Sequence, residues 1–301
     1  MKKLLRFALV AATLVSAQRR DLRLERDEHR VALVIGNNAY ARAPLKNAVN
    51  DAMVFGRTLR ELGFDVELIT DANGQAMDQA VDRLTRKLRT GDVALFYFAG
   101  HGVQIEGSNY LIPTDFSGDQ PTDVKYKAVS GPWVLDRLDA TGARLKVIIL
   151  DACRNNPFRG ARAMSGGLGQ MSAARGSFIA FATGPGQVAD DNVTGSNGLF
   201  TDELVKAIRL PNLSLDDVFT RVREAVDKRS GGQQLPWTSS SVLGRFSFRV
   251  DQPDSQKPEP YTSNIRPATV RVNPKDGLKY VWIEPGTFSD GLLKRRYRLL
   301  S

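Results

Sequence analysis

The only cysteine of the chain and one of its two histidines each follow an apolar segment with the character of a buried strand. His101 comes shortly after the apolar residues 93–99, and Cys153 comes shortly after the apolar residues 147–150. In doubly wound α/β proteins, reactive groups gather where parallel strands end. A cysteine needs a nearby base to form the thiolate that attacks carbonyl carbon. The pair therefore predicts nucleophilic catalysis, with Cys153 as the nucleophile and His101 as the base.

Glycines flank His101 on both sides, and the N–H groups of such a backbone can face a developing oxyanion. A second interpretation stays open at this point, because a lone cysteine is often a small buried hydrophobe and a histidine between glycines can simply end a strand. The other histidine, His29, lies in the charged run 26–30 and is expected to be solvated. One Cys and two His exclude an internal disulfide and a zinc site of several cysteines.

The elements that must position these residues follow an alternating pattern from residue 30 onward. Apolar runs bounded by glycine predict buried strands, and apolar residues at helical spacing predict the helices between them. The strands are expected at 31–35, 64–70, 93–99, 147–150 and 177–183, with an edge strand at 242–250, and helices at 48–62, 77–88, 199–208 and 215–226. Strands separated by helices imply βαβ units, so the fold class is α/β with a mainly parallel sheet covered on both faces.

Composition and charge narrow the function classes. The chain has 301 residues, of which 42% are hydrophobic and 25% are charged, as in an ordinary globular protein. The net charge is +9, but the basic excess lies at the two ends of the chain. A protein that tracks phosphates carries its charge on the folded domain, so nucleic acid is not expected as a partner. A nucleotide-binding protein is disfavoured, because no Gly-x-Gly-x-x-Gly follows the first strand and no Walker loop is present.

Residues 1–17, MKKLLRFALVAATLVSA, have the features of a secretory signal peptide: a basic start, an apolar stretch and small residues at a cleavage site. We therefore expect an exported protein, periplasmic or secreted; the alternative is a short amphipathic helix. The apolar stretch 7–15 is too short to span a bilayer, so no stable membrane span is expected after its removal. One folded domain is expected at 30–250, a Pro-rich linker at 251–268 and a separate C-terminal piece at 269–301.

Seven motifs in a fixed order resemble the caspase-like cysteine peptidases (peptidase C14), in particular the bacterial metacaspase-related branch, the orthocaspases. The motifs are RVALVIGNNAY at 30–40, LKNAVNDA at 45–52, YFAGHG at 97–102, NYLIPTD at 109–115, LDAC at 150–153, FATGPGQVA at 181–189 and PWTSSSVLGRFSF at 236–248. The resemblance covers residues 30–250 and implies a three-layer α/β/α caspase-like fold. It implies a cysteine endopeptidase that cuts protein or peptide substrates.

The resemblance also implies a role for individual residues. His101 and Cys153 match the catalytic dyad, and the N–H groups of Gly102 and Cys153 match the oxyanion hole. Asp151 and Asp51 match the carboxylates of an acidic pocket (S1) that accepts Arg or Lys before the scissile bond; the alternative for Asp51 is an ordinary surface acid of a helix. The rival function is a catalytically inactive caspase-like module that binds peptides or partners. An intact His and Cys disfavour it.

Three arginines between the nucleophile and the next strand are candidate self-cleavage sites, since peptidases of this kind are often matured in that loop. They are Arg159, Arg162 and Arg175. The alternative is that they only make the loop soluble.

No cofactor and no metal is expected. Some metacaspases use calcium, but the candidate ligands Asp115, Asp119 and Asp123 are scattered and position 160 is Gly, which argues against a calcium requirement. The sequence after the cysteine, Arg-Asn-Asn-Pro at 154–157, departs from the pattern of many metacaspases. Residues 273–288 resemble the opening of a formylglycine-generating-enzyme-like (sulfatase-modifying factor) domain. Such domains are much longer, so 269–301 is expected to be a truncated remnant without activity.

Overall fold

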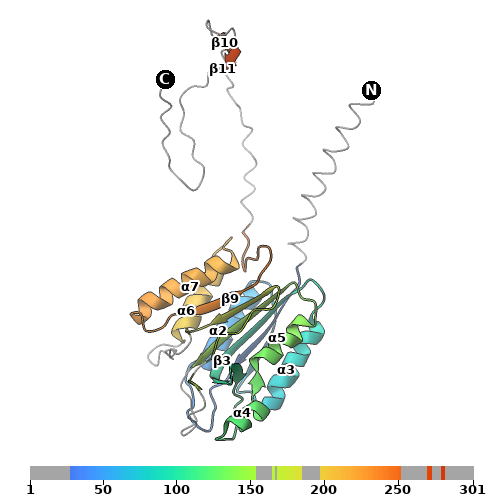
Figure 1. Cartoon of the computed structure of the whole chain (residues 1–301), viewed down its shortest axis with the longest axis vertical. Helices are drawn as coiled ribbons and strands as arrows, with labels where there is room; N and C mark the ends of the chain where they lie inside the picture. The colour runs from blue at the N-terminus through green and yellow to red at the C-terminus, as the bar shows by residue number, and fades with distance from the viewer. Residues whose placement is uncertain are drawn as a thin grey trace. The chain divides into compact units, whose positions relative to one another are not determined.

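The computed structural model describes residues 28–153, 165–166, 168–184, 197–251, 270–272 and 279–281. The chain divides into two compact units, Met1–Asp251 and Gln252–Ser301 (Figure 1). In the second unit, the described part is an antiparallel pair of short strands, β10 (Val270–Val272) and β11 (Lys279–Val281). The expected leader at 1–17 lies outside the described residues.

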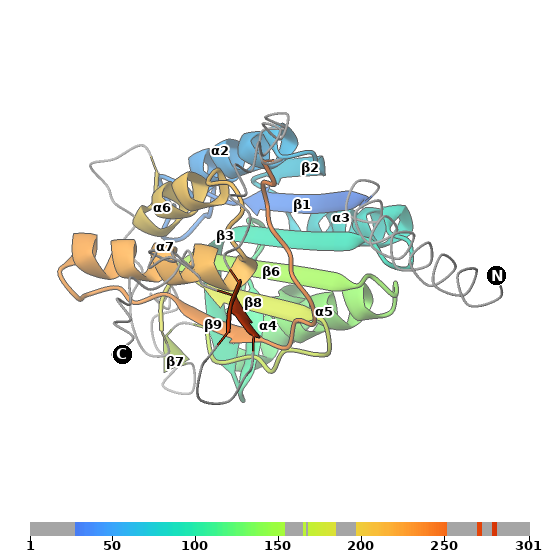
Figure 2. The ribbon, with the colours of Figure 1, turned by 90° about the horizontal axis from the view of Figure 1, so that it is seen from above.

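A six-stranded sheet forms the centre of the first unit, in the order β2-β1-β3-β6-β8-β9 (Figure 2). Its strands are β1 (Arg30–Gly36), β2 (Asp65–Thr70), β3 (Val93–Ile105), β6 (Leu145–Cys153), β8 (Ser177–Phe181) and β9 (Trp237–Ser240). The first five are parallel, and β9 closes one edge in the antiparallel direction. The predicted α/β class with a mainly parallel sheet is confirmed.

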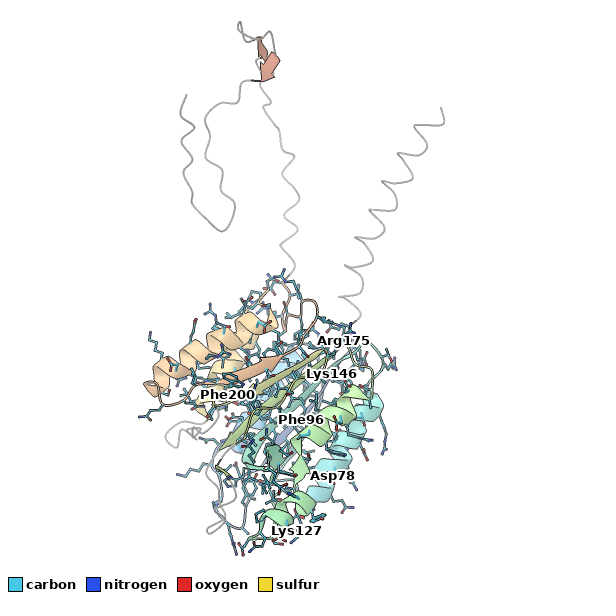
Figure 3. All side chains as sticks on the ribbon, viewed as in Figure 1. Asp78, Phe96, Lys127, Lys146, Arg175 and Phe200 are labelled. Carbon is cyan, nitrogen blue, oxygen red and sulfur yellow. The ribbon has the colours of Figure 1, made fainter. Side chains whose placement is uncertain are left out.

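Helices cover both faces of this sheet, which gives three layers (Figure 1). One face packs against α2 (Ala48–Glu61), α6 (Leu199–Ile208) and α7 (Leu215–Ser230), and the other against α3 (Gly74–Lys87) and α5 (Gly131–Asp139). Alternate residues of β3 enter the two cores, because successive strand side chains point to opposite faces. Tyr97 packs in the core that contains Phe200 of α6. Phe96 packs in the other core, and Figure 3 labels Phe96 and Phe200.

Local capping sets where several helices begin and end. The side chain of Asn73 accepts the N–H of Ala76 at the start of α3, and Ser214 forms a capping box with Asp217 at the start of α7. α7 ends at Ser230, and its C-cap is Gly231, whose φ of 62° is the left-handed conformation that glycine adopts readily. Among the described helices, none combines the length and the apolar character that crossing a membrane requires.

Several strands differ from the expectation, and β6 runs from Leu145 to Cys153 rather than over 147–150. β3 does not end at residue 99 but continues through His101 to Ile105, and its last part pairs with β4 (Ser108–Leu111) and with β7 (Ser165–Gly166) in antiparallel fashion. β4 also pairs with β5 (Val129–Ser130), which follows the short helix α4 (Pro121–Lys127). The edge strand expected at 242–250 is wrong. The edge strand is β9, and Phe246 and Phe248 fill the core from an extended segment after Gly244, whose φ is 83°.

Candidate active site

His101 and Cys153 are register partners on neighbouring parallel strands. The register of β3 against β6 pairs Phe98 with Leu150, and continues to His101 opposite Cys153. Neighbouring strands of a sheet lie about 4.8 Å apart, so the backbones of the two residues are adjacent at the carboxyl edge of the sheet. The structure thus brings the two residues of the expected dyad together.

The imidazole of His101 is buried and held in one orientation. The side chain is part of a residue that is only 3% exposed, and its Nε2 lies 2.6 Å from the carbonyl oxygen of Ala43. A carbonyl oxygen only accepts hydrogen bonds, so Nε2 must carry the proton. Nδ1 is then the nitrogen that can take a proton from a thiol. The Ala43 carbonyl thus fixes the tautomer of His101.

A tyrosine of the β1–α2 loop holds the backbone of His101. The Tyr40 hydroxyl accepts the N–H of His101 at 2.9 Å and donates to the carbonyl of Ile112 at 3.0 Å. The Tyr40 ring lies 4.4 Å from the imidazole, centroid to centroid. Gly100 is required beside it, because a Cβ at that position would lie 2.5 Å from the Tyr40 hydroxyl oxygen.

Polar side chains fix the loop that carries Tyr40 and Ala43. The Asp71 carboxylate, at the end of β2, accepts the N–H groups of Asn38 and Ala39 at 2.7 and 2.8 Å. Asn37 is fully buried, and its amide oxygen accepts the N–H of Ala72 at 2.9 Å. At the other end of the loop, the side-chain amide of Asn38 donates to the Lys46 carbonyl at 3.0 Å. The Asn-Asn pair of the first motif therefore positions the loop.

Gly102, the expected oxyanion donor, lies in a closely packed part of β3. A Cβ on Gly102 would be 2.8 Å from Leu168 Cδ2 and 3.0 Å from the Ala152 methyl group. A side chain at this position would displace the segment at 168 or the strand β6. The role of the Gly102 and Cys153 N–H groups toward an oxyanion stays a prediction.

Asp51 and Asp151, the expected acidic pocket, converge on the N-terminus of α6. The N–H of Gly198, the N-cap residue, donates to Asp51 Oδ1 at 2.9 Å. A Cβ on Gly198 would lie 3.0 Å from Asp51 Oδ2 and 3.9 Å from Asp151 Oδ2. Two carboxylate oxygens therefore border one small space at the start of a helix. Asp51 is only 3% exposed, which excludes the ordinary surface acid considered for it.

Two buried hydroxyl groups that sequence analysis missed hold Asp151. Thr201 of α6 donates to Asp151 Oδ2 at 2.7 Å, and the Tyr97 and Thr201 hydroxyl oxygens are 2.6 Å apart. Since Thr201 gives its proton to Asp151, the Tyr97 hydroxyl is the donor to Thr201. Burial, and then the charges of Asp151 and Asp51, raise the pKa of the Tyr97 phenol well above its usual value. Tyr97 therefore stays a neutral donor. The one sequence signal for this arrangement was the presence of a tyrosine, Tyr97, in an otherwise apolar strand.

The three candidate processing arginines are not equivalent. Arg159 and Arg162 lie outside the described residues. Arg175 precedes β8, whose first residue lies opposite Lys146 near the start of β6. Arg175 is therefore near the N-terminal end of β6, whereas Cys153 is at its C-terminal end. The Lys146 ammonium donates to the Arg175 carbonyl at 2.7 Å, and Figure 3 shows the two residues together. The structure does not bring Arg175 near the candidate dyad.

The scattered acids considered for calcium each have another contact. Asp115 accepts the N–H of Gly74 at 3.0 Å, and Asp119 pairs with Arg42. Asp123 caps α4, and the backbone hydrogen bond from Gln120 is the main cause that lowers the pKa of its carboxyl group. In the part of the chain that the structure describes, no group of three or more His, Cys, Asp or Glu side chains could hold a metal ion.

Comparisons with known proteins identify the family of the chain. The caspase domain (peptidase C14) matches residues 29–247. A probable protease from a Desulfuromonadales bacterium is 31% identical over 215 residues, which cover 59% of this chain and 26% of that protein. The human mucosa-associated lymphoid tissue lymphoma translocation protein 1 is 31% identical over 126 residues, 42% of this chain and 15% of that protein, and the mouse homologue matches equally. This chain thus corresponds to about a quarter or less of these relatives. Because the family match extends over most of its length, the chain belongs to the caspase-domain family of peptidases.

Proposed function

We propose that this chain is a cysteine endopeptidase that cleaves peptide bonds after Arg or Lys, as in the metacaspase-related branch of the family. The observation that carries the proposal is the register of His101 opposite Cys153, with His101 Nε2 bonded to the Ala43 carbonyl. This hydrogen bond selects the tautomer in which Nδ1 is the base. Family membership supports protein or peptide substrates.

The proposed reaction is an acyl transfer through the cysteine. Nδ1 of His101 takes the thiol proton of Cys153, and the thiolate attacks the carbonyl carbon of the scissile bond. The carbonyl oxygen becomes an oxyanion facing the N–H groups of Gly102 and Cys153. His101 then gives its proton to the leaving amine, the C–N bond breaks, and a thioester remains. Water, deprotonated by His101, hydrolyses the thioester and releases the acid product and the free thiol.

The acidic pocket supports a basic residue before the scissile bond (P1). Asp51 Oδ2 and Asp151 Oδ2 border the space next to Gly198, and a guanidinium or ammonium group pairs with such oxygens by charge-assisted hydrogen bonds. The N-terminus of α6 stabilises carboxylates at this position. Thr201 bonds the Asp151 carboxylate at 2.7 Å, which orients it. The two negative charges oppose an aspartate at P1.

Hydrolysis of fluorogenic peptides that end in Arg, Lys or Asp, with and without calcium, tests this function. We expect cleavage of the Arg and Lys peptides, no cleavage of the Asp peptide and no need for calcium. The inactive binding module is the rival function; it predicts binding of the basic peptides by the folded chain without release of the fluorophore. Cleavage after Asp would contradict the assigned pocket while leaving the peptidase activity standing.

We also propose that the protein is exported, periplasmic or secreted, after loss of residues 1–17. Expression in a bacterial host followed by fractionation and N-terminal sequencing is expected to give a mature chain that starts at Gln18. A chain that keeps Met1 in the cytoplasmic fraction would contradict export.

A further inference from the structure

A cavity of about 150 Å³ adjoins the imidazole of His101. Its walls come from the β1–α2 loop and from the segment that follows β4. The lining includes Tyr40, Arg42, His101, Ile112, Phe116 and Ser117. An apolar cavity of about this size holds a benzene molecule, so it can accept one aromatic ring or one branched aliphatic side chain.

The cavity and the acidic pocket lie on different sides of His101. Asp51 and Asp151 meet at α6, on the sheet face that α2 and α6 cover. The segment 112–118 is bonded toward the other face: the Thr114 N–H donates to the Ala72 carbonyl, and Asp115 accepts the N–H of Gly74 at the start of α3. No residue of the acidic pocket lines the cavity.

Several polar groups around the cavity already have partners. Arg42 pairs with Asp119, and the Tyr40 hydroxyl is bonded to the Ile112 carbonyl and the His101 N–H. The Thr114 hydroxyl donates to the Asp71 carbonyl at 3.1 Å. A polar guest would have to compete with these hydrogen bonds, whereas an apolar one buries surface against Tyr40, Ile112 and Phe116.

We propose that this cavity binds the side chain of the substrate residue that follows the scissile bond (P1′), and that it selects an aromatic or branched aliphatic residue. The inference rests on the proposed function, in which His101 protonates the leaving amine. That amine belongs to the P1′ residue, so P1′ lies beside the imidazole. The P1 side chain turns toward Asp51 and Asp151, and the P1′ side chain reaches the cavity on the other side of His101.

The test measures binding and cleavage separately. Labelled peptides that differ only at the position after a single Arg (Phe, Leu or Gly) are titrated against the Cys153→Ala chain by fluorescence anisotropy. The same peptides, internally quenched, are given to the wild type. We expect the Phe and Leu peptides to bind about tenfold more tightly than the Gly peptide and to show a higher kcat/KM by a similar factor.

The test variant is Ser117→Phe, whose new side chain fills the cavity from its rim. The control variant is Ser240→Phe, which makes the same substitution on the edge strand β9, away from the cavity. In the Ser117→Phe chain, the ratio of kcat/KM between the Phe peptide and the Gly peptide is expected to fall to about one. The Ser240→Phe chain is expected to keep the wild-type ratio. Equal binding of all three peptides, or a ratio that Ser117→Phe leaves intact, would overturn the assignment of the cavity. Selective binding without any cleavage by the wild type would instead support the cavity and overturn the peptidase.

Discussion

The carbonyl oxygen of Ala43 lies 2.6 Å from Nε2 of His101, and Ala43 holds it there with a φ of 53°. Residues with a side chain rarely adopt this left-handed conformation. The surrounding loop is bonded by Asp71 and Asn38, which keeps Ala43 in place. A strained backbone beside a catalytic group is a common way to aim a polar atom.

Substitution of Ala43 is expected to lower kcat when the new side chain disfavours the left-handed backbone conformation at this position. Ala43→Gly can keep the left-handed backbone, whereas Ala43→Val cannot do so without strain, because its side chain is β-branched. We expect kcat of the Val variant to be at least about tenfold below that of the Gly variant, with both chains folded by circular dichroism. Equal kcat values would show that the Ala43 carbonyl does not orient His101.

The Asp51→Asn and Asp151→Asn variants are expected to lose selectivity for basic residues. Each amide keeps an acceptor oxygen for Gly198 or Thr201 but removes the charge that a guanidinium needs. Because charge-assisted pairs are worth a few kcal/mol, the ratio of kcat/KM between Arg and neutral peptides is expected to fall about a hundredfold. Asp216→Asn, an exposed acid in the first turn of α7, is the matched control. An unchanged ratio in both pocket variants would place the selecting charge elsewhere.

Tyr97 is expected to make the fold more sensitive to alkali. Its pKa is raised in the folded chain, so above about pH 10 the unfolded chain loses the phenol proton while the folded chain still binds it. Stability therefore falls as pH rises, by up to about 1.4 kcal/mol per pH unit. Urea unfolding at about pH 9 and about pH 11 should show a larger loss for the wild type than for Tyr97→Phe. Parallel losses in the two chains would mean that the Tyr97 phenol titrates normally.

Self-cleavage is expected after Arg159 or Arg162 and not after Arg175 in the folded chain. The bond after Arg175 is fixed in the sheet: the Gly176 N–H donates to the Ser241 carbonyl at 3.0 Å, and the Lys146 N–H donates to the Gly176 carbonyl at 2.9 Å. Cleavage requires an extended, accessible segment. Mass spectrometry of the incubated wild type, with Cys153→Ala as control, identifies the new termini. A fragment that ends at Arg175 under native conditions would contradict this expectation.

The alternation of apolar runs with helical spacing was enough to predict a parallel sheet covered on both faces. It also predicted that His101 and Cys153 lie close together, since parallel strands end at the same edge of a sheet. The length of β3 was not predictable in this way. The glycines around His101 look like a strand end, yet here they permit close packing against Tyr40, Leu168 and Ala152. The edge strand was misplaced because Phe246 and Phe248 alternate like strand residues but are buried from an extended segment.

The missed members of the candidate site have physical reasons of their own. Ala43 acts through a backbone carbonyl, which no side-chain pattern marks. Thr201 sits in an apolar helical stretch, and its partner Asp151 is 50 positions away in the chain. Asp51 could be assigned to the pocket only by resemblance, because its approach to Asp151 depends on where the N-terminus of α6 lies.

Hydrolysis of an Arg peptide by four chains tests the catalytic dyad most directly: the wild type, Cys153→Ala, His101→Ala and His29→Ala. His29 is the matched control, since it is the other histidine and its Nδ1 lies 2.8 Å from Asp92 in a partly exposed pair. We expect kcat/KM to fall by about 10³-fold or more in the two dyad variants and to stay near the wild-type value in His29→Ala. Substantial hydrolysis by folded Cys153→Ala would contradict the account.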